Sequence, residues 1–233
     1  VATTNRRGPV EHATDLSTDD LPAPAPVLGF LLVHAALRRE MGTLVAAAEQ
    51  GATDMGRRLD LFDRVIRAHH HGEDRVLLPV LRSRDAAIRE AADEVEADHA
   101  RLDTTLDALR AAAWTGGDER VRTGIHDLAT FLDDHLALEE TRLLPVWLAA
   151  LSPAEHEQFA RRLRRATPWR ALSVMVPWLM DAVPDPFRGV AERELPPAVR
   201  FAYRHALRAR FERRWRDGVE AGGPVSLGHL AAA

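Results

Sequence analysis

The chain has 233 residues, of which 46% are apolar, so it can bury the core of one large domain or of a domain with an extension. Its net charge of −4 argues against a general polyanion binder. All 31 basic residues are arginine, which excludes Schiff-base and phosphate-loop lysines. The chain has no cysteine, which excludes disulfides, thiolate zinc sites, iron–sulfur clusters and cysteine nucleophiles, so any metal must be held by histidine and carboxylate.

Targeting signals are not visible in the sequence. We find no apolar run near 18 residues and no signal peptide with a charged start and an apolar centre. We therefore expect a cytoplasmic protein without membrane association. Residues 1–26 are polar and then rich in Pro and Ala, which predicts a flexible arm whose His12 binds nothing.

A first helix is predicted over about 27–50, ending before Gly51. His34 lies within its apolar stripe. A single histidine on an apolar face is more often a core residue than a ligand, so His34 is weak evidence of a site by itself.

The second predicted helix, about 54–81, carries His69 and Glu73 on its apolar face. Residues four apart on a helix lie on the same face, roughly 5–6 Å apart at Cβ, so this pair can bind one metal or two adjacent metals. Pro79 near the end of the segment is expected to kink or stop the helix.

The two histidines that follow His69 are rotated away from it by about 100° per residue. His71 should face solvent. His70 lies at the edge of the face and pairs with Asp74 at a spacing of four, which offers a competing register. His70 therefore stays open as an extra ligand or a group that orients one.

A third helix is predicted over about 85–113, with His99 facing inward. We expect a surface role for Asp103, although it could also orient or replace a ligand, being four residues after His99. A set of acidic side chains is interpreted as a solvated face: Glu90, Asp93, Glu94, Glu96 and Asp98.

The fourth predicted helix, about 118–150, carries His135 and Glu139 inward. His126 is half a turn out of phase and should be exposed, and Glu140 is the exposed alternative to Glu139.

The second and fourth helices share a motif. His69, Glu73 and Pro79 align with a second set, His135, Glu139 and Pro145, and both prolines follow Leu-Leu. The upstream helices repeat as well, since His34-Ala-Ala-Leu matches His99-Ala-Arg-Leu. Such self-similarity is much stronger evidence than one His-x-x-x-Glu.

After residue 151 the repeat stops. Ser152-Pro153-Ala154-Glu155 predicts a capping box and a short helix. Helices are also predicted at 169–180 and 197–217. In the last one, we expect an arginine-rich solvated face rather than a nucleic-acid site, and Phe201, Leu207, Phe211 and Trp215 are expected to pack on the bundle or a partner. His156, His205 and His229 have no partner at ligand spacing.

The expected fold is all-α. It is an up-down-up-down antiparallel four-helix bundle over 27–150, preceded by the arm at 1–26 and followed by C-terminal helices over 151–233. The bundle should bring six side chains into one layer, where a metal must neutralise them: His34, His69, Glu73, His99, His135 and Glu139. Imidazole and carboxylate suit iron, manganese or zinc.

This ligand pattern over about 27–150 resembles the hemerythrin-like, or HHE cation-binding, domain family. The resemblance implies two non-haem iron ions, with oxo or hydroxo bridging, held by the six residues above, with Glu73 and Glu139 as bridges. Oxygen carriers of the family have a fifth histidine four residues from another on helix three, but here Val95 and Asp103 occupy those positions. This departure favours reaction with oxidants over reversible O2 carriage.

Our first functional hypothesis is a di-iron protein that binds or reacts with O2, peroxide or NO in oxidative or nitrosative stress. Peroxide disproportionation would fit it, although the sole tyrosine, Tyr203, lies outside the motifs and no proton donor is evident. The alternative is an oxygen or iron sensor or store that signals through its C-terminal helices to a partner or a second copy. The third is a helical domain with a structural metal.

Overall fold

The computed structural model describes residues 24–215, and these residues form helices and turns without a strand. The arm expected at 1–26, with His12, lies almost entirely outside the described residues, as does His229. The helices of the first two thirds are α1 Ala25–Glu49, α2 Met55–Gly72, η2 Glu73–Leu77, α3 Leu78–Arg84, η3 Ala86–Ile88, α4 Arg89–Trp114, α5 Asp118–Leu138, η4 Glu139–Leu143 and α6 Leu144–Ala150.

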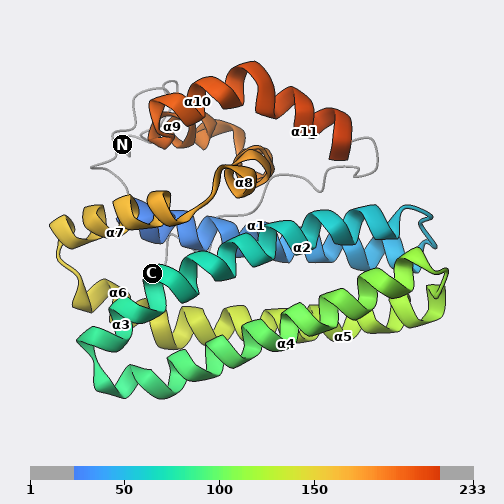
Figure 1. Ribbon diagram of the computed structural model, residues 1–233, viewed down its shortest axis with the longest axis horizontal. Coiled ribbons are helices and arrows are strands. Elements are labelled where there is room, and N and C mark those ends of the chain that lie inside the picture. Colours follow the sequence, from blue (N-terminus) through green and yellow to red (C-terminus); the bar gives the residue numbers. More distant parts are fainter. Residues whose placement is uncertain (1–23, 216–233) are drawn as a thin grey trace, which may run out of the picture.

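Four long rods form the bundle: α1, α2 with α3, α4, and α5 with α6 (Figure 1). Each rod packs against two others, since α1 contacts α2 and α5, while α4 contacts the same two helices from the other side. Short connections join consecutive rods, which makes neighbours antiparallel. The predicted up-down-up-down bundle with additional C-terminal helices is confirmed.

Two rods contain a wide π turn at the same place in the repeated motif. The turns η2 and η4 begin at Glu73 and Glu139, and each ends two residues before a proline, Pro79 or Pro145. A proline in a helix removes one backbone donor and clashes with the carbonyl four residues earlier. We attribute the local widening to this clash. Pro79 does not stop the helix as one of the two expected outcomes had it, because the rod continues to Arg84.

The apolar core is split into two clusters along the bundle axis. One cluster includes Leu37, Ile66, Leu102 and Leu132, and the other includes residues nearer the opposite end of each rod, such as Leu31, Val76, Val95 and Leu143. On every rod the motif residues fall between these two sets. The bundle therefore has a polar layer enclosed above and below by packed side chains.

The C-terminal helices lie over one face of the bundle (Figure 1). They are α7 Pro153–Ala166, α8 Trp169–Ala182, α9 Asp185–Glu194, α10 Pro197–Ala202, η5 Tyr203–Leu207 and α11 Arg208–Trp215. The capping box at Ser152 is confirmed. Within 24–215, no helix combines the length and apolar character that crossing a membrane requires.

Three expectations for this region were incomplete or wrong. The helix α9 was not predicted, because the prolines that flank it read as a loop. The segment expected as one helix over 197–217 contains the π turn η5, and 216–217 lie outside the described residues. Phe201 is 66% exposed instead of packed, whereas Leu207 and Trp215 are buried. The division into arm, bundle and extension stays a prediction.

Candidate metal centre

The six residues expected to bind metal are all buried and lie close together in the polar layer. They come from six elements: His34 from α1, His69 from α2, Glu73 from η2, His99 from α4, His135 from α5 and Glu139 from η4. His70, which we left open as an extra ligand, is 3% exposed and lies in the same layer.

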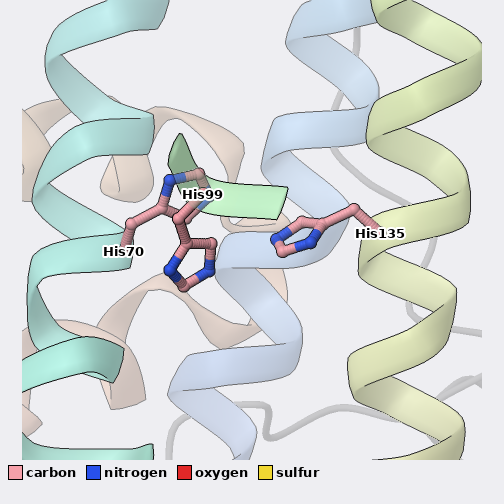
Figure 2. Close-up of side chains that lie close together, drawn as sticks. All are labelled: His70, His99 and His135. Carbon is pink, nitrogen blue, oxygen red and sulfur yellow. The ribbon is translucent and has the colours of Figure 1, made fainter. Parts of the chain in front are cut away.

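The seven side chains divide into two groups that could each hold a cation. One group is His34, His69, Glu73 and Glu139, and the other is His70, His99 and His135. Figure 2 shows the imidazoles of the second group converging between the helices. The rings of His70 and His99 are stacked with centroids 3.9 Å apart, and those of His99 and His135 are 5.0 Å apart.

The position of α2 explains why two adjacent histidines both reach the layer. His69 faces α1, where its ring centroid is 5.1 Å from that of His34, and His70 faces α4, where it stacks on His99. A buried helical face is at least about 100° wide, which is the rotation between neighbouring residues. The repeated motif favoured one register, His69 with Glu73, and left His70 open; in the structure both histidines reach the layer.

The two glutamates lie between the histidine groups. Glu139 places Oε2 3.1 Å from Nε2 of His34 and Oε1 3.6 Å from Nε2 of both His99 and His135. Glu73 places Oε1 3.2 Å from Nε2 of His69 and Oε2 3.5 Å from Nε2 of His99. Each carboxylate thus directs one oxygen to each of the two histidine groups.

These contacts fit ligands of a metal better than hydrogen bonds. The facing nitrogens and oxygens are buried. Among residues 24–215, Nε2 of His34, His69 and His99 and both oxygens of each glutamate have no hydrogen-bond partner. Buried polar groups without partners are rare because they cost free energy. Two ligand atoms that each lie about 2.1 Å from one metal are roughly 3 Å apart, close to the observed separations.

His34 and His99 are oriented by carboxylates outside the layer. Nδ1 of His34 lies 2.9 Å from Oε1 of Glu140, and Nδ1 of His99 lies 2.7 Å from Oδ1 of Asp74. Arg38 donates to both oxygens of Glu140, at 2.6 and 3.2 Å. Such contacts fix the tautomer that leaves Nε2 free for a metal.

Two acidic residues expected at the solvated surface instead lie beside the layer. Glu140 is only 24% exposed at its side chain, and Asp98 is 14% exposed, with Oδ2 3.7 Å from Nδ1 of His135. Asp98 precedes His99 and Glu140 follows Glu139, so the helical period places both at the edge of the buried helical face. In the structure the neighbouring rod covers that edge.

The two buried carboxylates differ in how readily they ionise. Burial, together with the charge of Glu139, raises the pKa of Glu73 well above its ordinary value. Burial also acts to raise the pKa of Glu139, but the imidazoles of His34 and His99 outweigh it and hold that pKa well below its ordinary value. A cation between the two carboxylates would let both stay ionised.

The pKa values of the histidines differ within each group. Burial lowers the pKa values of His69 and His70 well below the ordinary value, which keeps both imidazoles neutral as metal ligands must be. Burial also acts to lower the pKa of His99, but the contact with Asp74 outweighs it and raises that pKa to about 9.

An aromatic wall closes the layer on the side of His34 and His69. The ring centroid of Phe30 is 3.9 Å from that of His34 and 5.8 Å from that of His69, and Trp147 packs on Phe30 edge-on at 5.5 Å. Both aromatic side chains are buried. This side of the layer is therefore apolar and screened from water.

The remaining candidates lie away from the layer. Asp103 pairs with Arg67 (Oδ2–Nη1 2.8 Å), in agreement with the expected surface role. His71 and His126 are exposed, as predicted. His156 on α7 was set aside because it has no partner at ligand spacing. It is buried against Trp147 of α6, with ring centroids 6.2 Å apart.

A buried layer of histidines, with glutamates between them, places the protein in the class of metal-binding four-helix bundles. A comparison with protein families matches residues 29–147 to the Hemerythrin HHE cation binding domain. The chain therefore belongs to the hemerythrin HHE cation-binding family, which confirms the resemblance seen in the sequence. All seven side chains of the layer lie within the matched residues.

One curated relative is the zinc finger protein BRUTUS of Arabidopsis thaliana, which is 28% identical over 185 residues. The aligned region is 71% of this chain and 14% of that protein, so the chain spans a small part of its relative. No solved structure matches the chain.

Proposed function

We propose that the protein holds two non-haem iron ions in this layer and reacts with O2, hydrogen peroxide or NO. The carrying observation is that Glu73 and Glu139 each direct one oxygen to each histidine group. Two carboxylates in that position suit a pair of adjacent metals. Iron and zinc both accept imidazole and carboxylate ligands, but only iron also exchanges electrons.

The two sides would offer different numbers of protein ligands. His70, His99 and His135 would hold one ion, and His34 and His69 the other, with the glutamates shared. The expected set held four histidines, one fewer than in oxygen carriers. With His70, the buried layer has five histidines, so ligand number no longer argues against reversible O2 binding.

The protein's own groups would select and shield the small ligand. The side of His34 and His69 has fewer ligands, so a diatomic molecule or peroxide would bind there, against Phe30. Glu140 and Asp74 would hold the imidazoles in place. Tyr203 is buried in a separate cluster with Val176 and Met180, so it does not serve as the proton donor.

Metal analysis tests the proposal directly. After anaerobic loading with Fe(II) and desalting, we expect about two irons per chain in the wild type and a loss of at least one in Glu73→Ala. Glu94→Ala, a change of the same type on the exposed face of α4, should retain both. Fewer than one iron in the wild type, or equal loading of all three proteins, would refute it.

A sensor or store without turnover is the second candidate. The extension is tied to the helix that carries His34, because Nε1 of Trp178 on α8 donates to the buried Glu40 of α1 at 3.3 Å. Rapid peroxide consumption by the loaded protein would favour an enzyme. Reversible O2 or NO spectra without consumption, with altered protease sensitivity of α8–α11, would favour the sensor.

A further inference from the structure

A basic hollow lies between α7 and the rod that contains η2 and α3. Its volume is about 480 Å³, within the range of small-molecule sites. Three guanidinium groups line it, those of Arg75, Arg162 and Arg165, and its apolar lining includes Val76, Pro79 and Val80. We call it the arginine pocket.

The three arginines have no acidic partner in the part of the chain that the structure describes. Within residues 24–215, none of them makes an ion pair, and no acidic residue lines the pocket. Other arginines close by are paired, since Arg161 on the same helix meets Glu157 (Nη1–Oε2 3.4 Å) and Arg84 meets Glu155. Three unpaired cations at one hollow stand out in a chain whose net charge is −4.

The wall formed by α7 is held in place rather than loosely attached. A Cβ on Gly72 would lie 2.8 Å from Cδ1 of Leu163, so α7 packs directly on the backbone at the end of α2. The other end of α7 is fixed by the capping box of Ser152 with Glu155. Arg162 and Arg165 are three residues apart and share a face, where like charges repel unless an anion lies between them.

We propose that the arginine pocket binds a small organic anion with two or more carboxylate or phosphate groups. Guanidinium groups pair with both kinds of oxyanion in a two-pronged geometry, and the apolar lining accepts the carbon body of such a molecule. The occupant would contact η2, because Arg75 and Val76 directly follow Glu73 and Asp74. This inference goes beyond the proposed iron chemistry and does not depend on it.

Calorimetric titration of the full chain tests the proposal, with citrate and inorganic pyrophosphate as probes at a constant ionic strength of about 0.15 M. We expect saturable one-site binding of at least one probe, weakened about tenfold or more in Arg162→Glu with Arg165→Glu. The matched control is Arg161→Glu with Arg164→Glu, which makes the same charge change outside the pocket and should bind within about twofold of wild type.

The outcomes separate the sources of the anion and the failure of the idea. Binding of citrate alone identifies a carboxylate site, binding of pyrophosphate alone a phosphate site, and binding of both a general polyanion site. Arg75→Gln, which adds no negative charge, should also weaken binding while circular dichroism shows an unchanged helix content. Absence of binding by both probes, or an equal loss in the control pair, would overturn the proposal.

Discussion

Nδ1 of His34 lies 2.9 Å from Oε1 of Glu140, a residue that is not itself a candidate ligand. Arg38 donates to the same oxygen at 2.6 Å. The two contacts link the surface of the bundle to the buried layer, because His34 turns its Nε2 toward Glu139. The layer is thus organised by residues one step removed from the proposed metals.

We expect Glu140→Ala to weaken metal binding by about 10–100-fold, since an imidazole without its orienting carboxylate loses its fixed tautomer and direction. Competition with a chelator such as ferrozine measures the change. Asp133→Ala is the control, because it removes another partner of Arg38 (Nε–Oδ1 2.8 Å) but leaves Glu140 intact. Equal affinities for wild type and Glu140→Ala would show that Glu140 plays no part.

The adjacent residues His70 and His71 give a matched pair of variants that tests the group of His70, His99 and His135. His70 is 3% exposed and stacks on His99, whereas His71 faces solvent. We expect His70→Ala to lower the iron content from about two toward one per chain, because the three-histidine group loses a ligand. His71→Ala should leave it unchanged. If both variants load like wild type, the layer has six ligands rather than seven.

Much of the fold and most of the site could be predicted from the repeated motif. The offset of His69 and Glu73 from Pro79 reappears at His135 and Glu139, and helical geometry alone places each pair on one face. What escaped prediction depends on contacts between rods. Asp98 and Glu140 lie at the edge of the buried face of their own helices. Whether a residue at that edge is buried depends on how closely the neighbouring rod packs.

The π turns show a second limit. Hydrophobic periodicity does not register one extra residue in a turn, so η2 and η4 read as ordinary helix. The signal that could have found them was the shared Leu-Leu-Pro, since a proline within a continuing apolar stripe demands some local relief of the backbone. The sequence left the role of His70 open for a related reason, because a helix between two neighbours buries two adjacent residues on different sides.

Two glycines predict opposite effects on stability. Gly42 lies exposed in α1, and a Cβ added there would have no other atom within 4 Å, so Gly42→Ala should raise the free energy of unfolding by about 0.5–1 kcal/mol through helix propensity. A Cβ on Gly124 would lie 2.5 Å from Cδ2 of the buried Leu109. Gly124→Ala should therefore destabilise the bundle by roughly 1–2 kcal/mol. Urea unfolding measures both, and stabilisation by the two variants alike would contradict the packing.

The contact between the bundle and the extension predicts a dependence of stability on pH. Glu40 is 3% exposed and accepts a hydrogen bond from Trp178. Burial raises the pKa of Glu40 above its ordinary value of 4.5, against the smaller opposing effect of that hydrogen bond. The folded state therefore holds this proton more tightly than the unfolded state. Its contribution to stability is present in full below pH 4.5 and is lost as the pH rises toward the raised native pKa.

Glu40→Gln should remove this contribution, because the amide stays neutral and its carbonyl oxygen still accepts from Trp178. Relative to wild type, the variant should gain stability steadily as the pH rises above 4.5, and the gain should become constant once Glu40 is ionised in both states of the wild type. Urea unfolding between pH 4 and pH 8 measures the difference. Glu94→Gln, on the exposed face of α4, should show no such trend. A difference between wild type and Glu40→Gln that stays flat across this range would mean that folding does not raise the pKa of Glu40.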